Sequence, residues 1–332
     1  MRYKFTVLFL TISIQLFGQI AVEDFGYRHF QIEYLGDNVE FIVKSKKGDE
    51  KKRKPLLIFI QGSLAKPLIK YKNDGNHYPP FPFSEQLFTD KFHLVAINKP
   101  GVPLLENVNN LSKRGEFVDI RTGLPSLNYT NNNNLEYYTE RNGKVLRYLL
   151  NQDWVDSSVI VVAGHSEGSS IATKMATKNK NITHLIYSGG TIYYPRILSM
   201  VSQDRETETK EESWVEKDFE YWNDVNENPT GISREHGFNS YKGTYSFSES
   251  LNINLKELKI PVLISYGTKD SACPFNDLFK IEVIQDNLKN IQFLSYIGLE
   301  HNYFAIKNDK IDYSEFGWDN VIRDWIKWIN EN

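Results

Sequence analysis

The sequence predicts an α/β fold in which helices flank a mostly parallel central sheet. Continuous apolar runs rich in β-branched residues are typical of strands that are buried on both faces of such a sheet. Segments with apolar residues at helical spacing lie between several of these runs, and this alternation indicates α/β architecture. Such runs lie at residues 56–60 and 159–163, and residues 92–97, 183–188, 260–266 and 291–296 are expected as further strands of the sheet.

Other patterns complete the predicted fold. Residues 27–44 alternate between apolar and polar side chains around Gly36, which predicts two antiparallel strands joined by a turn. Residues 135–151 and 318–329 carry apolar side chains at helical spacing and predict helices that pack on the sheet. We further expect a helix over 279–288, a short helical link over 85–88, a loop over 66–84 and a long polar loop over 104–134.

The central apolar run leads directly into Gly164-His165-Ser166-Glu167-Gly168, and helical spacing resumes after it. The chain therefore passes from strand to helix within one tight turn. Glycines two positions before and after a serine let the backbone bend sharply and let the helix pack close to the strand. We expect Ser166 to project from the carboxyl edge of the sheet; the alternative is an ordinary turn in which Ser166 only caps the helix.

This GxSxG pattern resembles the nucleophile elbow of the α/β-hydrolase superfamily. The resemblance covers nearly the whole chain after its first 18 residues and implies a catalytic triad in the order serine, acid, histidine. Asp270 stands in the turn after residues 260–266, where relatives carry the acid, and His301 lies in the loop after the last strand. The resemblance therefore implies that Ser166 is the nucleophile, His301 the base and Asp270 the acid, with Asp277 as the alternative acid.

The same resemblance implies an oxyanion hole. The strand at residues 56–60 ends in Gln61-Gly62-Ser63, and relatives place a small-residue turn at this point. The backbone amides of Ser63 and Glu167 are the expected donors, with Leu64 in place of Ser63 if the register differs by one. Gln61 departs from the histidine that many relatives carry here.

The carboxylate of Glu167 has two interpretations. Beside the nucleophile, it is placed to bind a substrate amine. Alternatively, it is a solvated acid in the first turn of a helix, where the helix dipole favours negative charge.

Residues 191–259 interrupt the strand and helix alternation with clusters of charge and aromatic residues. In α/β-hydrolases, an insertion between the sixth and seventh strands usually forms a helical cap over the active site; the alternative is a surface excursion with its own small core. The domain layout is then residues 19–190 and 260–332 as the hydrolase core, with 191–259 as the cap. Substrate contacts are expected from Trp214, Tyr221 and Trp222 of this cap and from His77 of the loop at 66–84.

The first 18 residues have the pattern of a signal peptide. A basic start at Arg2 and Lys4 precedes an apolar run from Phe5 to Phe17, which is short for a membrane span, and Gly18 offers a small residue for cleavage. We therefore expect a secreted or periplasmic protein without a stable membrane anchor after cleavage. The lone Cys273 excludes an intramolecular disulfide.

Composition narrows the class of partner. The chain has 39 Lys and Arg residues against 42 Asp and Glu residues, so it lacks the basic excess that a nucleic-acid surface needs. No metal-ligand spacing such as HExxH and no phosphate-binding glycine loop occurs, so we expect neither a metal nor another cofactor.

These patterns predict an exported serine hydrolase that acts on a small-molecule ester or a peptide. The GHSEG form and the capped layout resemble carboxylesterases and prolyl-aminopeptidase-like enzymes. A carboxylesterase is the first expectation, because ester cleavage demands least of the leaving group, and a serine peptidase of the prolyl-aminopeptidase type is the alternative. A further alternative is a catalytically silent hydrolase fold that acts as a binding protein.

Overall fold

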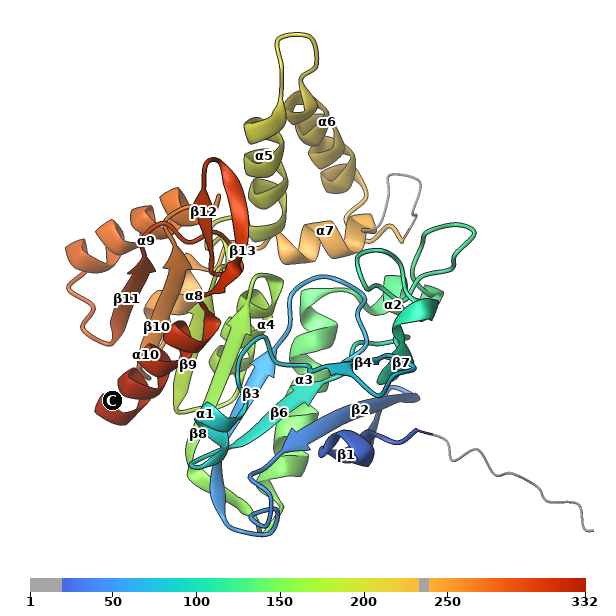
Figure 1. The fold of residues 1–332 in the computed structure, drawn as a ribbon. Coiled ribbons are helices and arrows are strands. Elements are labelled where there is room, and N and C mark those ends of the chain that lie inside the picture. Colours follow the sequence, from blue (N-terminus) through green and yellow to red (C-terminus); the bar gives the residue numbers. More distant parts are fainter. Residues whose placement is uncertain (1–19, 233–238) are drawn as a thin grey trace, which may run out of the picture.

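A mixed eight-stranded sheet forms the centre of the computed structural model, which describes residues 20–232 and 239–332 (Figure 1). The predicted signal peptide, residues 1–18, lies outside the described residues. The strand order is β1-β2-β6-β3-β8-β9-β10-β11; β2 is antiparallel to both of its neighbours and the other pairs are parallel. The strands are β1 (Arg28–Tyr34), β2 (Asp37–Lys44), β3 (Lys54–Ile60), β6 (His93–Ile97), β8 (Val155–His165), β9 (His184–Ser188), β10 (Val262–Gly267) and β11 (Ile291–Tyr296).

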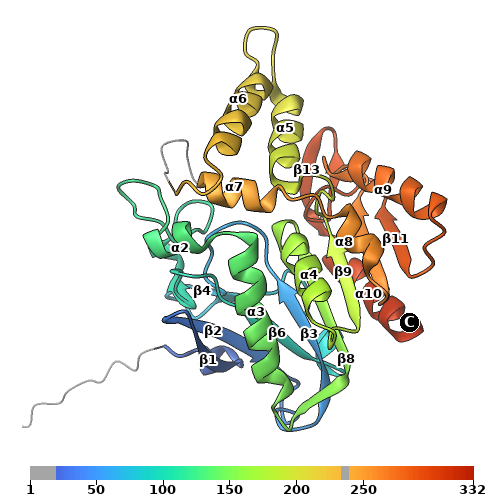
Figure 2. The ribbon, with the colours of Figure 1, turned by 180° about the vertical axis from the view of Figure 1, so that it is seen from behind.

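Helices cover both faces of this sheet, as Figures 1 and 2 show from opposite sides. The alternation of side chains along β3 explains why: Leu56 and Ile58 pack in one core cluster with α3 and α4, whereas Leu57 and Phe59 pack in a second cluster with α10. The predicted α/β-hydrolase architecture is therefore confirmed. The helices are α1 (Gln86–Thr89), α3 (Leu135–Leu150), α4 (Glu167–Lys178), α9 (Cys273–Gln285) and α10 (Trp318–Glu331).

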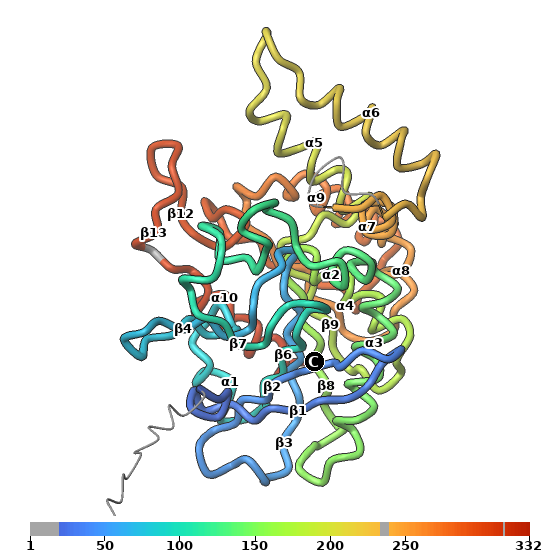
Figure 3. Tube along the Cα trace, turned by 90° about the vertical axis from the view of Figure 1, so that its right-hand side faces the viewer, coloured from blue at the N-terminus to red at the C-terminus, as the bar shows by residue number. Residues whose placement is uncertain are grey.

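In the described part of the chain between β9 and β10 there are four helices, and these two strands are the sixth and seventh of the main sheet in chain order. α5 and α6 pack on each other and project beyond the body of the molecule, and α7 lies at their base (Figure 3). The predicted helical insertion between these two strands is thus present. Its helices are α5 (Pro195–Thr207), α6 (Trp214–Glu227), α7 (Tyr241–Phe247) and α8 (Asn252–Glu257).

Two small sheets were not predicted. The stretches 66–84 and 104–134, expected as loops, pair with each other through a short parallel contact in which Ile69 lies opposite Leu105. Strands of two or three residues carry no readable alternation, and a partner distant in sequence cannot be found from local pattern. The additional elements are η1 (Val22–Phe25), β4 (Ile69–Tyr71), β5 (His77–Tyr78), β7 (Leu105–Asn107), η2 (Val108–Asn110), α2 (Leu127–Asn132), β12 (Phe304–Lys307) and β13 (Lys310–Phe316).

Among the described residues, no helix is both long enough and apolar enough to cross a bilayer.

Candidate active site

Ser166 is the single residue between β8 and α4, at the carboxyl end of a central strand. Its backbone has φ 57° and ψ −128°, a strained conformation for a residue with a side chain. A Cβ atom on Gly164 would lie 2.1 Å from the carbonyl oxygen of Gly168, and one on Gly168 would lie 2.1 Å from that of Ile60. Only glycine fits at these two positions. The Ser166 hydroxyl makes no capping hydrogen bond to α4, so it is not committed to the helix.

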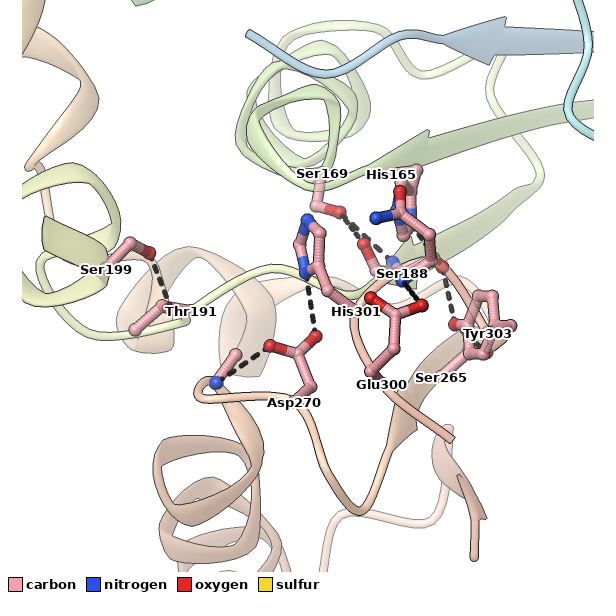
Figure 4. Close-up of polar contacts among 12 residues, drawn as sticks. His165, Ser169, Ser188, Thr191, Ser199, Ser265, Asp270, Glu300, His301 and Tyr303 are labelled. Carbon is pink, nitrogen blue, oxygen red and sulfur yellow. Dashed lines mark hydrogen bonds and ion pairs between the residues drawn. The ribbon is translucent and has the colours of Figure 1, made fainter. Parts of the chain in front are cut away.

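Asp270 and His301 lie on the loops that follow β10 and β11, and they meet beside this edge of the sheet. Nδ1 of His301 is 2.9 Å from Oδ2 of Asp270 (Figure 4). The other oxygen of Asp270 accepts a hydrogen bond of 3.0 Å from the Ala272 amide. Nε2 of His301 is therefore the ring nitrogen that remains for a serine hydroxyl. Asp277, the alternative acid, instead accepts a hydrogen bond of 2.6 Å from Tyr266.

The pKa of His301 is raised above its ordinary value of 6.5. Burial lowers this pKa, but the hydrogen bond and the charge of Asp270, with a contribution from Glu300, raise it by more. The ring of His165 lies 4.9 Å from that of His301, centroid to centroid. Burial, followed by the charge of His301, holds the pKa of His165 well below its ordinary value, so this neighbour stays neutral.

A chain of buried hydrogen bonds extends from His165 to the loop that carries His301. Nδ1 of His165 is 3.1 Å from the Ser188 hydroxyl, which lies 2.7 Å from the phenolic oxygen of Tyr303. That oxygen is also 2.9 Å from the Ser265 hydroxyl (Figure 4). The chain connects β8, β9 and β10 to the loop that carries His301, and it fixes this loop relative to the sheet.

Ser63 follows β3 and lies next to the elbow. A Cβ atom on Gly62 would be 3.3 Å from Cβ of Ser166, so the two turns are in close contact. The buried Lys99 ammonium donates a hydrogen bond to the Gly62 carbonyl and so orients the peptide that carries the Ser63 amide. In the described part of the chain, the amides of Ser63 and Glu167 donate to no backbone carbonyl. Both are free to bind an oxygen of a substrate.

The Glu167 carboxylate is neither solvated nor free. It forms an ion pair with Arg196, at the beginning of α5, and the two side chains are only 6% and 9% exposed. The expectation of a solvated helix terminus is wrong, because α5 packs over the elbow and removes water from Glu167. The interpretation as an amine-binding group also meets a difficulty, since a guanidinium already neutralises the carboxylate.

Two cavities contain both Ser166 and His301. The first, of about 220 Å³, has walls from the elbow, the turn at Ser271 and α5, which contributes Arg196 and Gln203. The second, of about 470 Å³, opens on the side of β3 and the proline-rich turn at residues 79–82. Ser63 lines both cavities, as Ser166 does.

The four expected substrate contacts lie elsewhere in the structure. Trp214 is 40% exposed and carries the Lys217 ammonium over its ring. The hydroxyl of Tyr221 is 2.8 Å from that of Thr244, and Trp222 stacks on another ring of the cap in a separate cavity. His77 is exposed, packs against Phe25 and lines a third cavity. None of these residues lines either cavity that contains Ser166.

The residues that line the two cavities come from other parts of the chain, and local sequence gave no signal for most of them. In the sequence, Arg196 resembles any other arginine of a helix, because its contact with Glu167 depends on how α5 packs on the elbow. Lys66 and Lys70, from the stretch at 66–84, line the second cavity. Arg114, from the stretch at 104–134, joins them.

Across residues 20–232 and 239–332, no three His, Cys, Asp or Glu side chains are grouped so that they could hold a metal ion.

Comparisons with known proteins bear on the fold and the family. No curated protein matches the sequence. Among solved structures, Est1E from Butyrivibrio proteoclasticus is similar with a TM-score of 0.53 at 13% identity, covering 92% of this chain and 99% of that one. A putative dipeptidyl aminopeptidase IV from Bacteroides ovatus gives 0.58 at 13% identity, with coverages of 92% and 36%. Acylaminoacyl peptidase from Pyrococcus horikoshii gives 0.52 at 16%, with coverages of 83% and 37%.

The chain thus spans little more than a third of the length of the two peptidases, and at these identities the likeness concerns the fold alone. The sequence comparison identifies the family more specifically than the structural likeness does. Residues 142–320, more than half of the chain, match the prolyl oligopeptidase family, and this stretch contains Ser166, Asp270 and His301. The resemblance to serine hydrolases of the α/β-hydrolase superfamily is confirmed, and the chain belongs to the prolyl oligopeptidase family.

Proposed function

We propose that this protein is an exported serine hydrolase that cleaves carboxylic esters through an acyl-enzyme on Ser166. The observation that carries the proposal is the hydrogen bond of 2.9 Å between His301 and Asp270 beside the strained serine of the elbow. A serine hydroxyl is a weak nucleophile at neutral pH and needs a positioned base to act. A histidine held by a buried carboxylate is such a base.

In the proposed reaction, Oγ of Ser166 attacks the substrate carbonyl carbon while Nε2 of His301 takes the hydroxyl proton. The tetrahedral intermediate places its oxyanion on the amides of Ser63 and Glu167; removal of one such donor in other hydrolases costs about 3 kcal/mol. The carbonyl forms again as the bond to the leaving alcohol breaks, and His301 returns the proton to that alcohol. Water then attacks the acyl-enzyme by the same steps and releases the acid and free Ser166.

Residues 191–259 act in this proposal as a cap, and residues 19–190 with 260–332 form the core. The support is that α5 contributes Arg196 and Gln203 to the first cavity, directly over the elbow. Export rests on the signal-peptide pattern of residues 1–18. Intact-mass measurement of the secreted or periplasmic protein tests it: loss of about the first 18 residues supports export, and retention of Met1 contradicts it.

A serine peptidase remains the second candidate, because the family and two of the similar structures carry peptidase names. Est1E, in contrast, has been solved with ferulic acid bound, and its whole length is covered by this chain. The capacity of the fold for both reactions makes the substrate assay decisive.

The test uses purified protein that lacks residues 1–18. A fluorophosphonate probe should label the wild type and not Ser166→Ala, and equal labelling would remove Ser166 as the nucleophile. Short acyl esters are then compared with aminoacyl and prolyl amides. Ester turnover in excess supports the esterase, comparable amide turnover supports the peptidase, and absence of both labelling and turnover supports a silent binding protein.

A further inference from the structure

The second cavity beside Ser166 is strongly basic. Three cationic side chains line it, from Lys66, Lys70 and Arg114. No Asp or Glu is found among the described residues that line it. The chain as a whole carries a formal net charge of −3, so this concentration of positive charge departs from the average surface. Ser166 and His301 line the same cavity, which places the cations next to the proposed reaction centre.

The side chains of Lys66 and Lys70 lie close to each other. Lys66 and Lys70 both pass close to Gly115: a Cβ atom there would be 4.0 Å from Cε of Lys66 and 3.7 Å from Cδ of Lys70. Within residues 20–232 and 239–332, neither ammonium forms an ion pair or a hydrogen bond to a protein group. Arg114 has only a loose ion pair, with Nε 3.7 Å from Oε2 of Glu116. Among the described residues, Glu116 is the carboxylate that pairs with Arg114 and raises the pKa of Lys66, and no carboxylate has such an effect on Lys70.

Mutual repulsion and burial make the positive charges of Lys66, Lys70 and Arg114 unfavourable unless an anion binds beside them. Burial and then the charge of Lys66 lower the pKa of Lys70 to about 8. Burial also lowers the pKa of Lys66, and Arg114 lowers it further while Glu116 opposes the change. With a pKa of about 8, Lys70 is still mainly charged at neutral pH. Partly buried cations without partners are costly, and a bound anion relieves both the desolvation and the repulsion.

The other residues that line the cavity indicate the chemistry of the substrate portion between the anion and the reacting carbonyl. Pro80, Phe81 and Trp318 give the cavity an apolar side. This combination fits a hydrocarbon or aromatic portion that ends in a negative charge.

We propose, on the basis of the proposed esterase function, that the preferred substrates carry a carboxylate on the portion that occupies this second cavity. Lys66 and Lys70 bind that carboxylate, and Arg114 strengthens the field at the mouth of the cavity. The chemical class is thus a hemiester or an ester of a carboxylated alcohol or phenol.

Matched ester pairs test the proposal on both sides of the scissile bond. 4-Nitrophenyl hemisuccinate is compared with 4-nitrophenyl butyrate, and 3-acetoxybenzoate with its methyl ester. In at least one pair, kcat/KM should be about tenfold or more higher for the anion, which corresponds to about 1.4 kcal/mol. The preference should shrink as salt is raised, because the mouth of the cavity is open to solvent. Equal kcat/KM within both pairs would overturn the proposal.

Variants assign the preference to the cluster. Lys66→Met and Lys70→Met should each lower the ratio of anionic to neutral kcat/KM several-fold, with unchanged melting temperature as the check on folding. Lys113→Gln is the matched control: this lysine is exposed, neighbours Arg114 in sequence and does not line the cavity. It should leave the ratio unchanged. A preference that survives in the Lys66 and Lys70 variants would contradict the assignment.

A binding measurement separates this inference from the proposed function. Calorimetry on Ser166→Ala measures the affinity for 3-acetoxybenzoate against that for its methyl ester. Tighter binding of the anion, lost in a variant that also carries Lys66→Met and Lys70→Met, supports the anion site even if the wild type hydrolyses no ester. Equal affinities refute the anion site even if the wild type proves to be an esterase.

Discussion

Arg196 at the beginning of α5 forms a buried ion pair with Glu167, the residue that follows Ser166 in the chain. This contact joins the cap segment to the elbow and lies at the position whose amide is the proposed oxyanion donor. A movement of α5 would therefore be transmitted to the peptide that binds the reacting oxygen.

The first prediction concerns this pair. Arg196→Met should destabilise the protein by about 3–5 kcal/mol, because it leaves a buried carboxylate without its counter-charge. Arg205→Met is the control on the same helix; its pair with Glu208 is exposed, and its loss should cost less than about 1 kcal/mol. Chemical denaturation measures both. Adding Glu167→Gln to Arg196→Met should recover much of the loss, and no recovery would mean that the pair is not what the substitution disrupts.

The second prediction assigns the acid. Asp270→Asn should lower kcat by about 10⁴, since the histidine loses the group that fixes its orientation and stabilises its cation. Asp277→Asn neutralises the acceptor of the Tyr266 hydrogen bond but keeps an oxygen that can accept it, and it should change kcat by less than about tenfold. Steady-state kinetics on one neutral ester distinguishes the two. The reverse order would move the acid to Asp277.

The third prediction follows from the raised pKa of His301. Only the neutral imidazole accepts the Ser166 proton, so kcat/KM should fall as the pH drops through a pKa above 6.5. Asp270 is a main cause of the raised pKa, and the residual activity of Asp270→Asn should keep its plateau to lower pH. Profiles of kcat/KM from about pH 5 to about pH 9 show both effects. An acid limb at the same pH in both proteins would assign that limb to another group.

The fourth prediction tests the close approach at the elbow. Gly168→Ala should cost about 3 kcal/mol or more, because its new methyl group meets the backbone of Ile60, which cannot move aside. Gly143→Ala is the contrasting variant within α3. Its nearest neighbour would be 3.4 Å away, and the change should stabilise the protein by about 0.5–1 kcal/mol. Thermal unfolding of both variants provides the comparison, and similar losses would show that the elbow has room for a side chain.

Much of the fold was predictable because its signals are local. A buried parallel strand favours a continuous apolar run, and β3, β6, β8, β9 and β10 each contain one. The small sheet of β5, β4 and β7 lacked such a signal, because each strand has only two or three residues and depends on a distant partner.

The candidate site divides in the same way. The glycines around Ser166, the turn at Asp270 and the loop at His301 have sequence signals, because the chemistry restricts the residue types in each turn. The aromatic residues within 191–259 carry no sequence signal that separates side chains facing the substrate from those facing elsewhere. Trp214, Tyr221 and Trp222 were therefore expected at the substrate, but they line neither of the cavities that contain Ser166.

The sequence by itself determined the sheet, the elbow and the order of Ser166, Asp270 and His301, since these depend on periodicity and on turn chemistry within a few residues. Only the tertiary structure decided that Glu167 is paired with Arg196 and that Lys66, Lys70 and Arg114 line one cavity with Ser166. The physical reason is that the environment of a charge depends on burial and on neighbours from distant segments. The chain must fold before that environment exists.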